Sequence, residues 1–127
     1  MTENDKQWTC KPFWESQKTK YERLVQFFNA DGQPNEWGNG EQPKRATRNQ
    51  VYAYKMQYEV GDINTERAGG DWELQRWDAW NSLKGMDKFT ALVDFNRLAE
   101  QVLEKLAIVH ENPNKAEEDK TYKFCVD

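Results

Sequence analysis

The sequence predicts an all-α protein built as a four-helix bundle, and three observations lead to this fold class. Apolar residues recur every three or four positions in four separate stretches, which is the period of a helix buried along one face. Turn-forming glycine and proline residues separate these stretches. No stretch alternates apolar and polar residues, as a half-buried strand does. Four amphipathic helices can bury their apolar faces against one another around a single core.

The composition agrees with one small domain that has a very polar surface. Of the 127 residues, 31% are charged and the formal net charge is −4, but 13% are aromatic and six are tryptophan. Disordered chains are poor in aromatic residues, so we expect an aromatic core rather than disorder. The acidic balance of the chain disfavours nucleic acid as a partner.

The sequence also argues against several broad classes of protein. No apolar run approaches the roughly 18 residues needed to span a bilayer, so we expect no stable membrane insertion. The N-terminus carries Glu3 and Asp5 and lacks the apolar segment of a secretory signal. We therefore expect an intracellular, cytoplasmic protein, with a mitochondrial assembly left open. Cys10 and Cys125 have no metal-ligand spacing and are too few for a disulfide framework, and we expect no metal or cofactor.

The helical domain is predicted over residues 16–110, between a polar N-terminal arm at 1–15 and a polar tail at 111–127. Its first helix is predicted over 16–29, and a loop rich in glycine and proline follows at 31–43. The core face of this first helix comprises Tyr21, Leu24, Val25 and Phe28.

Three further helices are predicted over 47–60, 71–83 and 87–109, and Gly61 ends the first of them. Their predicted N-cap residues are Thr47, Asp71 and Asp87. Their core faces comprise Val51, Tyr54 and Tyr58 on the first, Trp77, Trp80 and Leu83 on the second, and Leu92, Phe95, Ala99, Val102, Leu106 and Val109 on the third.

The residue types of a catalytic site are scarce. His110 is the only histidine, and its position at the end of a predicted helix is typical of a surface residue stabilised by the helix dipole. No serine or cysteine lies in a nucleophile motif. Gly69-Gly70 is a turn rather than a phosphate-binding loop, because no Lys-Ser or Lys-Thr follows it. The sequence therefore does not predict an enzyme.

A binding site for an anion is a more specific prediction. Lys44, Arg45 and Arg48 lead into the helix that carries Tyr52, Tyr54 and Lys55, and Arg76 lies on the next helix. Cations neutralise phosphate groups and aromatic rings stack on bases, so this set suits a ligand with both. The alternative interpretation is that the tyrosines belong to the core and the cations are solvated surface residues.

Two motifs identify a family that the chain resembles. Residues 60–67 read VGDINTER, and residues 77–85 read WDAWNSLKG. They are similar to the two signature segments of the acyl-CoA-binding protein family, in the same order and at close to the same separation. A looser similarity covers residues 21–106. The resemblance implies an up-down-down-up four-helix bundle, here with a longer loop between the first and second helices.

The resemblance also implies a function. Family members are not enzymes, and they bind long-chain acyl-CoA esters non-covalently as intracellular carriers that transport and pool lipid for fatty acid metabolism. The ligand-binding residues that it implies here are Tyr52, Tyr54, Lys55, Arg76 and Phe95.

The match at these positions is incomplete. Arg76 replaces a lysine of the family and keeps its charge, whereas Phe95 replaces a tyrosine and loses its hydroxyl. A gap-free alignment from Gly61 retains Tyr52 but places the family's Tyr-Lys pair on Lys55 and Met56. A shift by one residue restores that pair as Tyr54-Lys55 and misplaces Tyr52.

An alternative function follows from these departures. Leu24 and Val25 stand where the family has small residues, and their bulk is expected to narrow the acyl groove. The bundle would then bind ligand weakly and act as a structural or interaction subunit of a larger assembly. Protein partners would be recruited through the arm at 1–15, the loop at 31–43 or the tail at 111–127. Three tryptophans with no assigned role, Trp8, Trp14 and Trp37, support this alternative.

Overall fold

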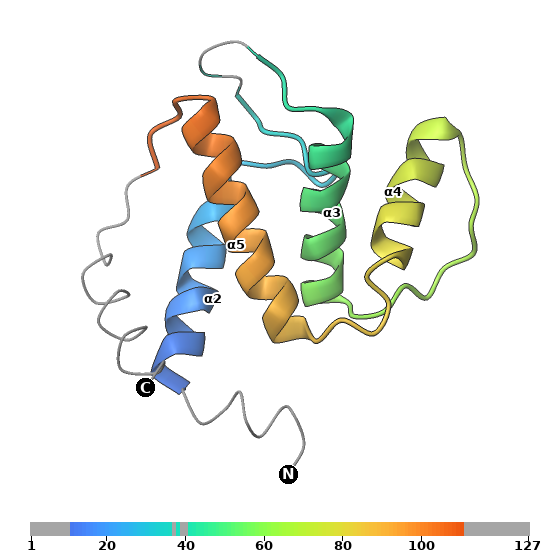
Figure 1. Ribbon diagram of the computed structural model, residues 1–127, viewed down its shortest axis with the longest axis horizontal. Helices are drawn as coiled ribbons and strands as arrows, with labels where there is room; N and C mark the ends of the chain where they lie inside the picture. Colours follow the sequence, from blue (N-terminus) through green and yellow to red (C-terminus); the bar gives the residue numbers. More distant parts are fainter. Residues whose placement is uncertain (1–10, 37, 39–40, 111–127) are drawn as a thin grey trace.

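The computed structural model describes residues 11–36, 38 and 41–110, and the chain forms four helices within them (Figure 1). They are α2 (Lys11–Val25), α3 (Arg45–Glu59), α4 (Asp71–Asn81) and α5 (Lys88–Lys105). In Figure 1, α2 and α5 run in one direction and α3 and α4 run in the other. The predicted all-α, up-down-down-up bundle is therefore confirmed. The arm at 1–10, the tail at 111–127, Trp8 and Trp37 lie outside the described residues.

The helix α5 occupies the centre of the bundle. It packs against both α2 and α3, while α4 packs against the opposite side of α3. The ring of Phe95 on α5 is fully buried, and its centroid lies 4.9 Å from that of Tyr21 and 6.2 Å from that of Phe28. The buried core cluster comprises Tyr21, Leu24, Phe28, Val51, Leu92, Phe95, Ala99, Val102, Leu103 and Leu106.

The first helix starts and ends earlier than the prediction of 16–29. It begins at Lys11, so the last part of the predicted arm is helical. Pro12 is compatible with this start, because the first turn of a helix needs no N–H bond from that residue. The ring of Trp14 packs 5.1 Å from that of Phe89, which attaches this first turn to α5. After Val25 the chain turns, although Phe28 still reaches the core.

The ends of α5 show one correct and one incorrect prediction. Asp87 is the N-cap, and its side chain accepts a hydrogen bond from the Thr90 N–H at 3.3 Å. The helix ends at Lys105 rather than near 109, because Ala107 takes a left-handed conformation with φ of 56°. The N–H of Ile108 then bonds to the Leu103 carbonyl, which is the closing pattern of a Schellman motif. Val109 is consequently 79% exposed and not part of the core.

The two predicted N-caps at α3 and α4 are wrong. Lys44 takes the N-cap position of α3 and Gly70 that of α4, and neither helix start has a side-chain cap. Thr47 and Asp71 lie inside the helices instead. The end of α3 matches the prediction, because Gly61 follows the C-cap with φ of 100° and its N–H bonds to the carbonyl of Met56.

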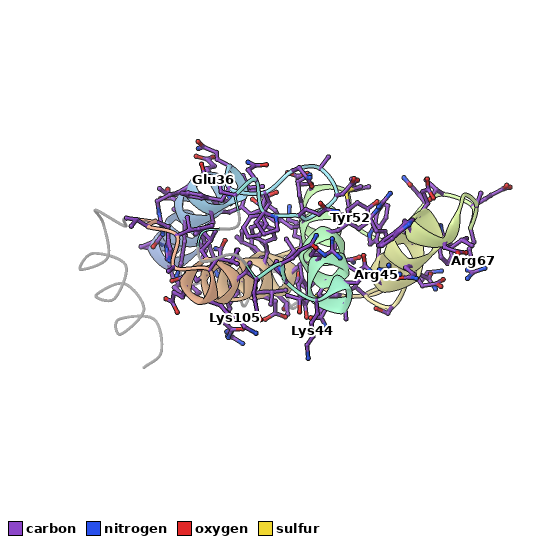
Figure 2. All side chains as sticks on the ribbon, turned by 90° about the horizontal axis from the view of Figure 1, so that it is seen from above. Glu36, Lys44, Arg45, Tyr52, Arg67 and Lys105 are labelled. Atoms are coloured by element: carbon purple, nitrogen blue, oxygen red, sulfur yellow. The ribbon has the colours of Figure 1, made fainter. Side chains whose placement is uncertain are left out.

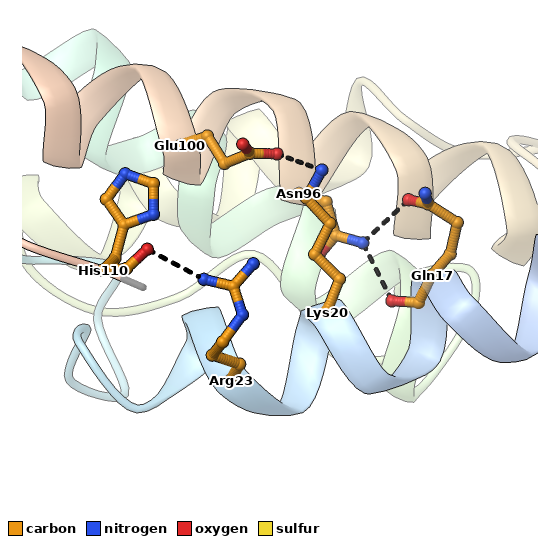
Figure 3. A network of polar contacts seen from close by, with 6 residues as sticks. All are labelled: Gln17, Lys20, Arg23, Asn96, Glu100 and His110. Atoms are coloured by element: carbon orange, nitrogen blue, oxygen red, sulfur yellow. Dashed lines mark hydrogen bonds and ion pairs between the residues drawn. The ribbon is translucent and has the colours of Figure 1, made fainter. Parts of the chain in front are cut away.

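A set of polar contacts fixes α2 against α5 (Figure 3). The buried side-chain amide of Asn96 donates to the Gln17 backbone carbonyl at 2.9 Å and to the Gln17 side-chain oxygen at 3.0 Å. Lys20 pairs with Glu100 one turn further along. Because buried polar groups are costly unless they are hydrogen-bonded, the pair of Asn96 and Gln17 favours one register of the two helices.

Candidate functional site

The turn after α3 is tied to the segment after α4 through Asp62. One carboxylate oxygen of Asp62 accepts from the Gln57 side-chain amide at 2.9 Å and from the Gly85 backbone N–H at 2.7 Å. These donors, and the nearby charge of Lys84, hold the pKa of Asp62 below its ordinary value. Gln57 also donates to the Met86 carbonyl at 2.9 Å. Asp62 thus connects the start of the loop after α3 to the segment that follows α4.

Three further contacts join the loop after α3 to the helix α4 itself. The indole N–H of Trp80 donates to the Gly61 carbonyl at 2.9 Å, and that of Trp77 donates to the Thr65 carbonyl at 3.1 Å. Arg67 forms two parallel hydrogen bonds with Asp78, at 2.8 and 3.0 Å. The VGDINTER and WDAWNSLKG motifs therefore bind each other, and their mutual contacts hold the loop against α4.

A cleft of about 380 Å³ lies between α3, α4 and this loop. Tyr52 of α3 and Arg76 of α4 face each other across it, with the guanidinium carbon of Arg76 5.9 Å from the centre of the Tyr52 ring. The ring of Tyr52 also meets Trp80 edge to face at 6.4 Å. The lining residues are Tyr52, Met56, Val60, Asn64, Thr65, Glu66, Ala68, Glu73, Arg76, Trp77 and Trp80.

The electrostatic environment of Tyr52 combines three effects. Burial raises the pKa of its hydroxyl above the ordinary value, the positive charge of Arg76 acts against this rise, and the negative charge of Asp31 adds to it. The carboxylate of Asp31 lies 3.8 Å from Nε of Arg76. The guanidinium of Arg76 thus lies near the ring and hydroxyl of Tyr52. Such a combination can bind a ligand that carries an anionic group beside an aromatic group.

Lys55 lies on the same side of α3 as Tyr52 but makes different contacts. Its amine is 3.4 Å from the carboxylate of Glu59, and Glu59 also accepts a hydrogen bond from the Tyr21 hydroxyl at 2.5 Å. Burial first, and then the hydrogen bond to Glu59, raise the pKa of Tyr21 far above its ordinary value. Lys55 is therefore linked through Glu59 to α2, and it does not line the cleft.

Two of the residues implied by the family resemblance lie apart from Tyr52. Tyr54 is two positions further along, which turns its side chain by about 200° around the helix. It packs against the core, and burial, together with the charge of Asp94, raises the pKa of its hydroxyl while Arg97 lowers it. Phe95 is enclosed by the core. The structure thus brings Tyr52 and Arg76 together, keeps Lys55 nearby on α3, and separates Tyr54 and Phe95 from the cleft.

The basic residues that lead into α3 do not form one cluster, because Lys44 and Arg45 make different contacts (Figure 2). The guanidinium of Arg45 stacks 3.3 Å from the centre of the Trp72 ring and contacts Gln75 at 3.4 Å, so it bridges α3 and α4. Lys44 instead lines a second cavity of about 370 Å³ that also includes Lys105 of α5. The apolar part of this second cavity is formed by Pro43, Leu98, Val102 and Leu106.

Several residues of the cleft are not predicted as ligand-binding from the sequence. Thr65 and Trp77 belong to the two quoted motifs. Met56 is considered only because one of the two alignments places the lysine of the family's Tyr-Lys pair on it. The motifs indicate that their residues are important. The fold is needed to tell which of these residues stabilise the loop and which face the cleft. Asp31 carries no such signal, because it lies in the loop after α2 and meets Arg76 of α4 only in the folded chain.

Among the described residues, no helix combines the length and apolar character needed to cross a membrane. No group of three or more metal-ligating side chains comes together in this part of the chain either. The lining of the cleft combines the cation of Arg76 and aromatic rings with the carboxylates of Glu66 and Glu73.

Comparison with known proteins agrees with the motifs. The family described as "Acyl CoA binding protein" matches residues 18–99. The chain is 36% identical over 59 residues to "Acyl-CoA-binding domain-containing protein 1" of Oryza sativa subsp. japonica, covering 45% of this chain and 65% of the relative.

Two further relatives are also named for acyl-CoA binding. The chain is 34% identical over 58 residues to a protein from a species of the genus Hypsibius, covering 44% of this chain and 65% of that relative. It is 34% identical over 59 residues to "Acyl-CoA-binding domain-containing protein 3" of Oryza sativa subsp. japonica, covering 45% of this chain and 38% of that relative.

The aligned region therefore spans less than two thirds of each of these relatives. The family match itself extends over most of the chain and includes α3, α4 and the cleft between them. Together with the bundle topology and the paired motifs, it establishes that this chain belongs to the acyl-CoA-binding protein family.

Proposed function

We propose that the protein binds long-chain fatty acyl-CoA esters non-covalently and acts as an intracellular carrier that transports and pools them for lipid metabolism. The observation that carries this proposal is the pairing of Tyr52 with Arg76 across the cleft between α3 and α4. Arg76 supplies a cation for a phosphate group of the CoA head, and the rings of Tyr52 and Trp77 offer surfaces for the adenine base.

The acyl chain and the phosphate groups of the ligand contribute to binding in different ways. Burial of each methylene of an acyl chain stabilises the complex by about 0.8 kcal/mol, so a long chain adds substantial affinity. The phosphate groups, in contrast, provide the distinction from a free fatty acid. We propose binding without chemistry at the thioester, because the family that matches this chain is described as a binding protein.

The remaining residues of the site are proposed to assist rather than to form the cleft. Lys55, 3.4 Å from Glu59, carries a second cation on the same side of α3 and can reach an additional phosphate if it leaves that ion pair. Tyr54 and Phe95 are proposed to support the site by packing against the core beneath α3.

Isothermal titration calorimetry with palmitoyl-CoA, CoA and palmitate tests the proposal. We expect palmitoyl-CoA to bind with one site per chain, CoA to bind more weakly, and palmitate to bind weakest because it lacks the phosphates. Circular dichroism of the same samples checks that the chain is helical. Absence of binding by a helical, monomeric chain would overturn the carrier proposal and favour the role of an interaction subunit.

A further inference from the structure

The turn that follows α2 has a fixed shape that presents Asp31 at its tip. The side-chain oxygen of Asn29 accepts hydrogen bonds from the N–H groups of Asp31 at 2.9 Å and of Gln33 at 3.0 Å. The backbone of Asn29 bonds to Gln33 in addition, and Phe28 forms a bridge with Pro34. The carboxylate of Asp31 takes no part in these bonds, so the turn holds its backbone and leaves the side chain to make other contacts.

The same turn rests directly on the backbone of α3. Gly32 has φ of 82°, and a Cβ at this position would lie 2.5 Å from the Arg48 carbonyl oxygen and 2.7 Å from the Tyr52 backbone nitrogen. These approaches are shorter than any side chain tolerates, so only glycine allows the turn to sit this close. The position of Asp31 relative to Tyr52 is therefore determined by direct backbone packing.

From this position Asp31 reaches the cation of the cleft. Its carboxylate lies 3.8 Å from Nε of Arg76, whose guanidinium also lies over the ring of Tyr52. A second cation on this side of α3, Arg48, has a buried Nε that finds no hydrogen-bond partner within the described part of the chain. Asp31 thus pairs with the same guanidinium that a bound phosphate would need.

We propose that Asp31 is a specificity-determining residue that competes with the ligand's phosphate for Arg76 and thereby limits the affinity for anionic head groups. This inference rests on the proposed function, because it names a residue that tunes the same site. A phosphate that binds Arg76 must displace the Asp31 carboxylate or accept its repulsion at short range. Displacement costs the free energy of the pair between Asp31 and Arg76, and binding beside Asp31 costs the repulsion between the two anions, so both routes lower the affinity.

The size of the effect follows from the exposure of the pair. The side chains are 51% exposed for Asp31 and 22% exposed for Arg76, so solvent screens their interaction. Pairs of this kind contribute about 0.2–1 kcal/mol, which corresponds to about a 1.4- to 5-fold change in affinity. The effect should decrease as the salt concentration rises, because salt screens exposed charges.

The test compares palmitoyl-CoA affinity for the wild-type chain and for Asp31→Asn by calorimetry at low and high salt. Asparagine keeps the turn, because the bonds of the turn involve the backbone of residue 31. Asp31→Ser serves as a second variant should the asparagine chain misfold. Glu36→Gln is the matched control, since it removes one exposed acidic charge from the same loop.

The proposal predicts tighter binding of palmitoyl-CoA by Asp31→Asn, by about 1.4- to 5-fold at low salt and less at high salt, with Glu36→Gln unchanged. In the Arg76→Gln background the gain should disappear, because Asp31 acts through Arg76.

Two results overturn it in distinguishable ways. Equal or weaker binding by Asp31→Asn, with binding by the wild-type chain intact, removes Asp31 from the specificity of the site and leaves the proposed function standing. Absence of binding by all helical variants, Asp31→Asn included, overturns the proposed function and this inference together.

Discussion

The indole N–H of Trp80 donates to the backbone carbonyl of Gly61 at 2.9 Å and closes the turn between α3 and α4. Trp80 is buried, with only 4% of its surface exposed, and Gly61 ends α3 with a positive φ of 100°. One side chain therefore secures the end of one helix, the start of the loop and part of the cleft wall.

Replacement of Trp80 by phenylalanine should destabilise the fold. The substitution leaves the Gly61 carbonyl without its donor and should lower the free energy of unfolding by about 1–3 kcal/mol. Trp77→Phe is the matched comparison, because Trp77 makes an equivalent bond to Thr65 in a more exposed position and should cost about 1 kcal/mol or less. Urea unfolding followed by circular dichroism measures both values, and a larger effect at Trp77 would contradict the prediction.

Asp62 should make stability depend on pH in the acidic range. Its pKa is lowered in the folded chain, mainly by the Gly85 N–H and then by Gln57, so its contribution is present above the unfolded pKa of about 4. That contribution is lost as the pH falls through the lower folded pKa. Urea unfolding from neutral to strongly acidic pH should show a smaller loss of stability for Asp62→Asn than for the wild-type chain. Parallel curves for the two chains would show that Asp62 is not responsible.

The buried amide pair of Asn96 and Gln17 should contribute to stability as a unit. Asn96→Ala leaves the Gln17 carbonyl without a donor in the core and should lower the free energy of unfolding by about 1–3 kcal/mol. Asn96→Leu combined with Gln17→Leu should cost less than the sum of the two single substitutions, because both polar side chains are removed together. Arg97→Gln, which breaks an exposed pair with Asp94, is the control and should have little effect. Additive effects of the two leucine substitutions would contradict the coupling.

Tyr52 and Tyr54, two of the tyrosines of α3, offer a matched test of where the ligand lies. Tyr52→Ala and Arg76→Gln should each weaken palmitoyl-CoA binding by about 1–3 kcal/mol, because each removes a proposed contact to the head group. Tyr54→Ala should leave the affinity of the folded protein nearly unchanged, because its side chain faces the core and α5. Calorimetry on all three variants decides the register, and a loss confined to Tyr54→Ala would place the ligand on the other side of α3.

The sequence was sufficient to predict the bundle and most of its core. The periodic faces of the first and last helices contain Tyr21, Leu24, Phe95 and Ala99, all of which are buried, because side-chain spacing reflects burial directly. The end of α5 could not be predicted, since Ala107 adopts a conformation for which glycine is the usual signal.

The site was only partly predictable for a different reason. Tyr52 and Arg76 were found because the family resemblance, aligned outward from Gly61 and Trp77, implies a ligand-binding residue at each position. The choice between Tyr52 and Tyr54 needed the helix packing. The approach of Asp31 to Arg76 depends on two segments 45 positions apart in the chain, and no local pattern encodes such a contact.

The mutual binding of the two motifs bears on how this protein can diverge. Asp62, Arg67, Asp78 and Trp80 make contacts within the pair of motifs, so substitutions there are penalised through folding whatever the ligand is. Asp31 and Met56 lie outside the motifs and so escape that constraint, although they lie at or beside the cleft. Substitutions at positions such as Asp31 and Met56 can thus change the ligand preference while the two motifs that identify the family remain unchanged.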